Sequence, residues 1–223
     1  MKISWLPTVA AAAVVGTVIR AVFFTPLEAR QGAAQKIYYI HVPSAWVAFL
    51  AFFLVAVASG VYLWLRDARL DRFAESSAEV GVVFTTVVLI TGPLWAKPIW
   101  GTYWTWWDVR LVSTLFLWFI YVSYMVLRGA IESPSLRARY SAILGILGAL
   151  LIPFIHLSVY LFATMHPMPI VLKPSKPSLP NEMLLTLLLS LASFTLLYFS
   201  FLRSRYRFAV ERDIYLAQAE SHA

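Results

Sequence analysis

The sequence predicts an all-α protein, a polytopic membrane bundle of six transmembrane helices. Of its 223 residues, 61% are hydrophobic and 13% are charged, whereas a soluble domain carries about 25% charged residues. The mean hydropathy is +0.74. Six continuous apolar segments occur along the chain, and they lack the period-two alternation of strands. Because lipid admits only helices and closed barrels, these segments are expected to be helices.

A helix needs about 20 residues to cross a bilayer, with about 17 to 25 tolerated. All six segments qualify, and their combined length suits a single integral-membrane domain over residues 1–223. In the fifth segment, Pro153 predicts a kink. The segments are Ile3–Thr25, Val42–Leu65, Val80–Ala96, Leu111–Leu127, Tyr140–Ala163 and Met183–Leu202.

The first segment has an alternative interpretation as a cleaved signal peptide, since it has a short basic start and an apolar core. No clear small-x-small cleavage site precedes Arg30, which favours retention of the segment. Cleavage would leave five spans and the same outer loops.

The distribution of Lys and Arg predicts that both termini are cytoplasmic. With the N-terminus inside, eleven basic residues fall on the inner side and six on the outer side. The outer connections are then 26–41, the Trp-rich stretch 95–110 between the third and fourth helices, and 164–182. The cytoplasmic tail 203–223 is expected to be a solvated helix. The net charge of +7 therefore reflects membrane orientation and does not indicate nucleic-acid binding.

The outer connection 164–182 contains five prolines and is expected to be extended. It could be a stiff connector or a wall over a site, and proline content does not decide between the two.

Five tryptophans lie within thirteen residues, from Trp95 to Trp107. An interfacial aromatic belt needs far fewer at one helix end. Such a concentrated aromatic shelf, beside a membrane surface, predicts a large, flat and mostly apolar ligand.

Ionisable side chains are scarce in the spans: the second to sixth segments contain no Asp, Glu, Lys or Arg. This argues against an ion-coupled transporter or proton pump. The chain has no cysteine, which excludes disulfides, thiolate metal sites and covalent haem attachment to itself. No nucleophile or acid–base pair is evident, so we expect a binding and transfer protein and no enzyme.

Two histidines, His41 and His166, lie at the ends of spans on the same side as the tryptophans. Two neutral imidazoles could occupy both axial positions of one haem iron. The alternative is that they are interfacial residues bonded to backbone or water. His156, deep in the fifth span, is expected to be a satisfied core histidine, and His222 to be solvated.

Lys36, Lys97 and Arg110 are the basic residues near the tryptophans. They could hold haem propionates or simply extend to the headgroup level. Asp108 is expected to cap the helix that begins near Arg110, which would not exclude orienting that Arg or bonding an indole.

The run Trp100-Gly101-Thr102-Tyr103-Trp104-Thr105-Trp106-Trp107-Asp108 resembles the signature of the tryptophan-rich, or WWD, haem-handling family, and most closely its bacterial cytochrome c maturation branch. The segments around His41 (36–43) and His156 (153–159), and the position of His166, agree with that resemblance. In one respect the run departs from the usual pattern: Trp107 adds a residue before Asp108, so Trp106 and Trp107 compete for one motif position.

The resemblance implies a protein of the bacterial inner membrane that binds haem b on its outer face. It implies axial ligation by His41 and His166, an aromatic platform including Trp100, Trp104 and Trp106 with Asp108, and basic residues at Lys36 and Arg110. The implied partners are a periplasmic haem chaperone, the ABC transporter subunits of the maturation complex and a small single-span subunit, besides membrane lipid.

Two other functions stay open on the residues alone. A b-type cytochrome subunit would need histidine pairs within the spans, where only His156 lies. A cofactor-free permease or assembly subunit would use the tryptophans as a partner surface.

Overall fold

The computed structural model describes residues 5–171 and 173–221. All of its named secondary-structure elements are helical within that part of the chain, and six helices are long and apolar enough to cross a membrane. The predicted six-helix membrane fold is thereby confirmed. His222, which was expected to be solvated, lies outside the described residues, as does Lys2, one of the eleven basic residues counted on the inner side.

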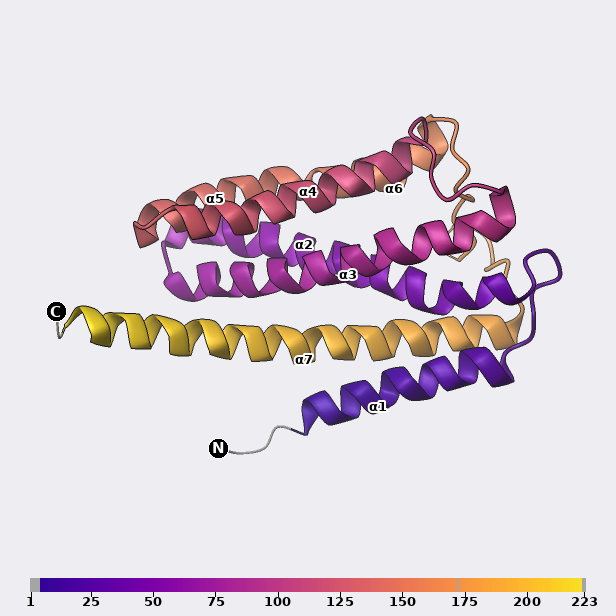
Figure 1. Cartoon of the computed structure of the whole chain (residues 1–223), viewed down its shortest axis with the longest axis horizontal. Helices are drawn as coiled ribbons and strands as arrows, with labels where there is room; N and C mark the ends of the chain where they lie inside the picture. The colour runs from indigo at the N-terminus through magenta and orange to yellow at the C-terminus, as the bar shows by residue number, and fades with distance from the viewer. Residues whose placement is uncertain (1–4, 172, 222–223) are drawn as a thin grey trace.

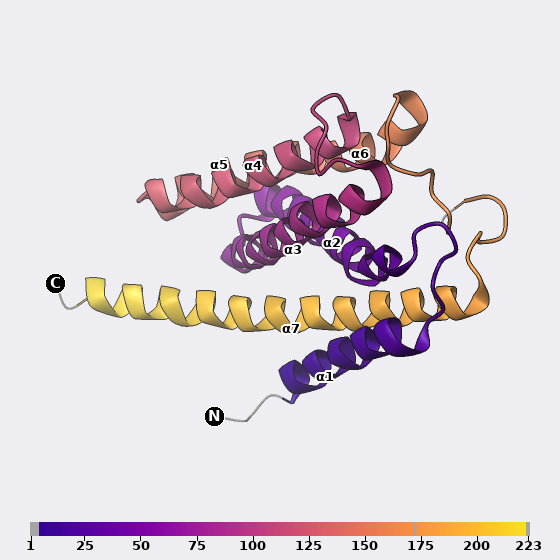
Figure 2. The ribbon, with the colours of Figure 1, turned by 45° about the vertical axis from the view of Figure 1, so that its right-hand side comes forward.

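The helices form an elongated bundle (Figure 1). Central α2 packs against α3, α5 and α7, while α1 lies at the edge of the bundle on α7 (Figures 1 and 2). The elements are α1 (Leu6–Ile19), continued by a π-helical turn η1 (Arg20–Phe24), a 3-10 turn η2 (Ala33–Ile37), α2 (Tyr38–Leu65), α3 (Ala68–Trp100), α4 (Val109–Ala130), α5 (Pro134–Ala149), α6 (Leu151–Leu161) and α7 (Asn181–Glu220).

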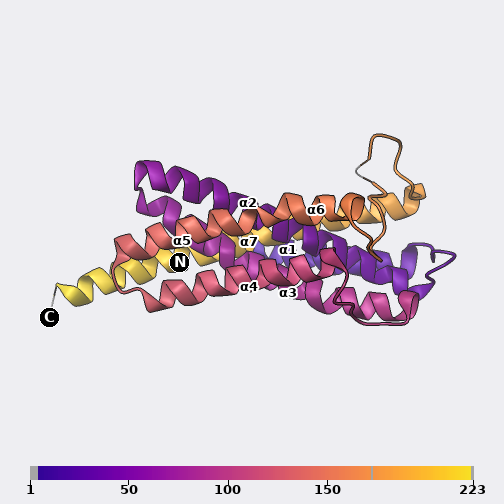
Figure 3. The ribbon, with the colours of Figure 1, turned by 90° about the horizontal axis from the view of Figure 1, so that it is seen from above.

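Three connections meet at one end of the bundle: 25–37, 101–108 and 162–180. The start of α1 and the end of α7 lie toward the opposite end, where the C-terminal part of α7 projects beyond the other helices (Figures 1 and 3). The grouping of loops agrees with the predicted orientation, and the side of the membrane on which each end lies stays a prediction. We call the end with the three connections the loop end.

Several helices are longer than their apolar segments. Trp95 and Trp100 belong to the last turns of α3, so the irregular part of the Trp-rich connection is only 101–108. α2 begins before His41, which places Pro43 inside the helix and not in its first turn. The kink expected from Pro153 is confirmed as the break between α5 and α6, because a proline ring clashes with the carbonyl four residues earlier.

Ion pairs explain the extensions of α3 and α7 away from the loop end. Arg128 of α4 binds Asp71 at 2.7 Å and Glu75 at 3.0 Å, and Arg212 of α7 binds Glu75 at 2.7 Å. Buried charges need such partners. The first part of the predicted tail, which also contains buried Ala209, therefore packs on α3 and is not a fully solvated helix.

The centre of the bundle is tightly packed. The Phe52 ring of α2 stacks on Tyr121 of α4 with centroids 3.6 Å apart. Gly81 of α3 faces the Phe52 ring so closely that any side chain there would collide with it. This close approach gives α2 and α3 a fixed mutual position, and both helices continue from here to the loop end.

Candidate functional site

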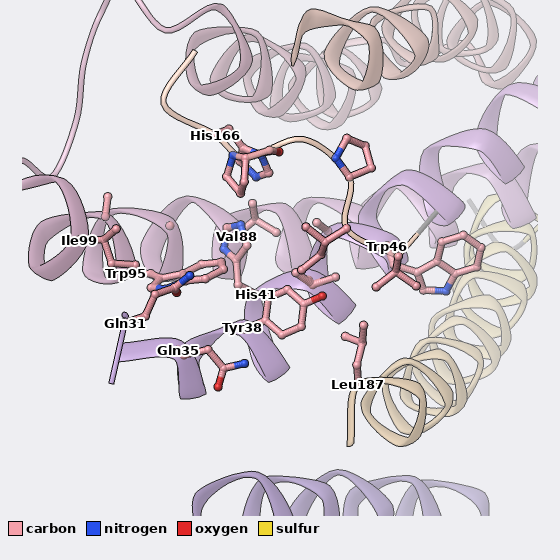
Figure 4. Close-up of a pocket in the computed structure, with 18 of the residues that line it drawn as sticks. Gln31, Gln35, Tyr38, His41, Trp46, Val88, Trp95, Ile99, His166 and Leu187 are labelled. Carbon is pink, nitrogen blue, oxygen red and sulfur yellow. The ribbon is translucent and has the colours of Figure 1, made fainter. Parts of the chain in front are cut away.

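A cavity of about 1260 Å³ opens at the loop end. It is lined by residues of α2, α3, α4, α6 and α7 and of all three connections at the loop end (Figure 4). Single small-molecule sites usually measure about 300–1,000 Å³. The cavity therefore has room for a ligand as large as a macrocycle, and its lining is predominantly apolar.

His41 projects into this cavity from the first turns of α2. Its Nδ1 lies 2.9 Å from the hydroxyl of Thr91 on α3, and that hydroxyl donates to the carbonyl of Val87 at 2.7 Å. The hydroxyl proton of Thr91 is thus bonded to Val87, so Nδ1–H of His41 donates to the Thr91 oxygen. The Nε2 lone pair is left free for a ligand.

The wall behind His41 fits its ring closely. Trp95 contacts the imidazole edge-on at 5.7 Å between ring centroids, and its indole N–H donates to Gln31 at 3.0 Å. At Gly92, an added Cβ would lie 3.3 Å from His41 Cε1. α3 therefore positions this histidine through a hydroxyl, an indole and a missing side chain.

His166 lies in the connection that follows α6. Its backbone N–H donates to Thr164 Oγ1 at 3.1 Å, and its Nδ1 lies 3.0 Å from the carbonyl oxygen of Pro167. A carbonyl only accepts, so Nδ1 carries the proton and Nε2 is again free. Burial lowers the pKa of His166 to about 3, and the charge of Arg110 acts in the same direction, so the ring is neutral at pH 7.

The structure brings His41 and His166 to one cavity, although they are far apart in sequence. Figure 4 shows the two side chains on facing walls. Across 5–171 and 173–221 no group of three or more His, Asp or Glu could hold a metal ion. Two unprotonated imidazole nitrogens, with no further protein ligand, suit an iron ion whose other coordination positions are filled by a macrocycle.

The tryptophans divide into two groups. Trp95, Trp100 and Trp104 line the cavity. Trp106 and Trp107 are 76% and 58% exposed and are not among the lining residues, because the turn before α4 directs them outward. The structure therefore does not bring Trp106 and Trp107 to the cavity, and their place in the aromatic platform stays a prediction. Trp95, which was not among the predicted site residues, does line the cavity.

Among the candidate basic residues, only Arg110 lines the cavity. Its guanidinium donates to the carbonyl of Ile155 at 3.3 Å and has no ion pair among the described residues. Lys36 instead donates to the carbonyls of Thr25 and Pro26, where the first span ends. Lys97 donates to Gly101 at 2.9 Å. Lys36 is thus not brought to the site.

Asp108 caps α4, as predicted: its Oδ1 accepts from the backbone N–H groups of Arg110 at 3.0 Å and Leu111 at 3.2 Å. The residue is fully buried and does not line the cavity. Its Oδ2 accepts from Thr164 Oγ1 and from the Met165 N–H, both at 2.8 Å. Nothing in the local sequence around Asp108 indicates this second pair of bonds.

The prediction of a satisfied core position for His156 is wrong. Its side chain is exposed, on the outer face of α6 at the rim of the cavity, and it has no hydrogen bond within the described part of the chain. The break before α6 turns this face outward. The connection 162–180 does form a cavity wall, through residues such as Pro167, Pro169 and Leu179.

Comparison with known proteins adds a family to this geometry. The family model of heme exporter protein C matches residues 1–219. The heme exporter protein C of Bradyrhizobium diazoefficiens is 40% identical over 174 residues, which cover 78% of this chain and 65% of the relative. That of Haemophilus influenzae is 34% identical over 192 residues, covering 85% and 77%.

A third relative, from Marchantia polymorpha, is named putative cytochrome c biosynthesis ccmC-like mitochondrial protein. It is 34% identical over 173 residues, covering 78% of this chain and 72% of its own length. Since the family model spans nearly the whole sequence, the chain belongs to the heme exporter protein C family.

Proposed function

We propose that this protein binds haem b as its cargo, between His41 and His166, and passes it to a periplasmic haem chaperone. Membership of the heme exporter protein C family gives the chain a role in haem handling for cytochrome c maturation, as a multi-pass protein of the inner membrane. The ligand set, the haem type and the recipient are the parts that we propose.

The observation that carries the proposal is the state of the two imidazoles. In each ring Nδ1–H is held by a protein acceptor, Thr91 for His41 and Pro167 for His166, which leaves Nε2 unprotonated. Histidines that bind metals typically have their other nitrogen fixed in this way. Both rings are thereby prepared to bind iron without first losing a proton.

The rest of the cavity fits the remainder of a haem. Trp95, Trp100 and Trp104 offer apolar surface to a flat ring. Arg110 and the indole N–H of Trp104, a buried donor with no partner among the described residues, could bind propionate oxygens. An unpaired buried donor is costly, which favours a ligand that supplies an acceptor.

No bond-making step is assigned to this chain. Haem would be held by two coordinate bonds and released by exchange of those ligands. The Ccm system to which the family belongs implies ABC transporter partners. We propose that a small single-span subunit also joins the complex, that the site faces the periplasm, and that membrane lipid surrounds the six spans.

The test is the absorption spectrum of the purified protein with its haem content. We expect a six-coordinate low-spin spectrum in the wild type, lost in both His41→Ala and His166→Ala. His156→Ala is the matched control, because that histidine is exposed and unbonded, and it should keep the wild-type spectrum. Wild-type haem content in both single variants and in the double variant would reject the ligand assignment. A colourless wild type from haem-replete cells would favour a cofactor-free permease.

A further inference from the structure

The structure assigns to Asp108 the role of a positioning residue: its carboxylate joins the start of α4 to the loop that carries His166. The inference rests on the proposed function and adds to it a residue that would not touch haem. It concerns how the second axial ligand is kept in place.

The two carboxylate oxygens have separate tasks. Oδ1 accepts the N–H groups of Arg110 and Leu111, which are free at a helix start. Oδ2 accepts Thr164 Oγ1 and Met165 N–H, both at 2.8 Å. Four donors therefore satisfy one fully buried carboxylate. We call the Oδ2 pair of bonds the latch.

The latch reaches His166 within one more bond. Thr164 Oγ1, which donates to Asp108, accepts the backbone N–H of His166 at 3.1 Å. Thr105 adds a further contact, from its hydroxyl to Met165 Sδ at 3.8 Å. His166 lies outside any helix or strand, so these contacts are its main attachment to the Trp-rich segment.

A neutral amide cannot replace this carboxylate. Asparagine is an equally good helix cap, but it has one acceptor oxygen and one donor nitrogen. In Asp108→Asn that oxygen can serve the cap or the latch, and not both. Thr164→Val removes the hydroxyl from the latch and leaves the cap intact, while Thr164→Ser keeps the hydroxyl and is the control.

Two measurements separate the latch from the haem proposal. The first is hydrogen exchange of peptides covering 162–170 in haem-free protein. We expect exchange to become at least tenfold faster in Asp108→Asn and Thr164→Val, and to stay as in the wild type in Thr164→Ser. Peptides from α4 should keep their protection in Thr164→Val.

The second is the spectrum of the haem-loaded protein. We expect Asp108→Asn and Thr164→Val to show a five-coordinate high-spin fraction and haem dissociation about 10- to 100-fold faster, as is typical when a residue that orients a metal ligand is lost. Added imidazole should restore the low-spin form. If the wild type binds no haem but the variants show the expected faster hydrogen exchange, the haem proposal is rejected and the latch is supported. Unchanged exchange and an unchanged spectrum in both variants would overturn the latch.

Discussion

The two histidines of the cavity are held in contrasting ways. His41 belongs to α2 and is fixed by Thr91, Gly92 and Trp95, three residues within two turns of α3. His166 belongs to an irregular connection and depends on a chain of single hydrogen bonds that ends at Asp108. One proposed ligand is thus part of the helical framework, and the other is attached to that framework by its loop.

The difference matters for the binding and release of haem that we propose. Displacing His41 together with its backbone would require movement of α2 against α3, whose packing is close at Phe52 and Gly81, and turning its ring would break the bond to Thr91. Withdrawing a loop-borne ligand requires only that a few hydrogen bonds break, each worth about 0.5–1.5 kcal/mol. We therefore expect ligand exchange to begin at His166 and His41 to be the last contact.

The largest effect should come from filling the space behind His41. In Gly92→Val the new side chain would push the imidazole away from Thr91, since even a Cβ would lie 3.3 Å from the ring. We expect low-spin ligation to disappear and haem affinity to fall by more than the roughly 100-fold that loss of one hydrogen-bond partner can cost, so that little haem is retained. Gly60→Ala is the control, because nothing lies within 4 Å of that position. Normal haem content in Gly92→Val would mean that α2 and α3 do not hold His41 rigidly.

A smaller effect is expected from Thr91→Val, which keeps the shape of the side chain and removes the acceptor for His41 Nδ1–H. Loss of such a partner typically lowers metal affinity about 10- to 100-fold. Thr91→Ser should retain wild-type affinity, as measured by haem transfer to an excess of apomyoglobin. If Thr91→Val and Thr91→Ser released haem at the same rate, the Thr91 hydroxyl would have no role in ligation.

The smallest effect should be that of pH on the wild type. An ordinary histidine titrates near pH 6.5, whereas burial and Arg110 lower the pKa of His166 to about 3. A protonated imidazole cannot bind iron, so acid should release His166 only near the lower value. We expect the low-spin spectrum to be constant from about pH 8 to about pH 5. A loss centred near 6.5 would show that the ring is solvated.

Much of the fold could be predicted from the sequence because lipid imposes long apolar helices and because Pro153 must break one of them. The two facing histidines could be proposed from their positions at span ends and from the family resemblance. The partners Thr91 and Gly92 could not, because an interhelical hydrogen bond or a missing side chain leaves no mark in a single sequence.

The tryptophan run shows a different limit. Its composition indicates an aromatic site, but which indoles turn inward depends on where α3 ends, at Trp100, and on the turn that follows. Asp108 was recognisable as a helix cap from its position, whereas its second oxygen meets Thr164, which lies 56 residues further along the chain. Tertiary contacts of this kind decide the site and are invisible to local patterns.

The length of α7 has a mechanical consequence. Its 40 residues form one rod of about 60 Å with no internal proline. Near one end Leu187 and Leu191 form part of the cavity wall, and near the other Arg212 is tied to Glu75. A tilt imposed at either end of α7 is therefore shared by the whole helix. The shape of the cavity and the ion pair between Arg212 and Glu75 are thus mechanically coupled.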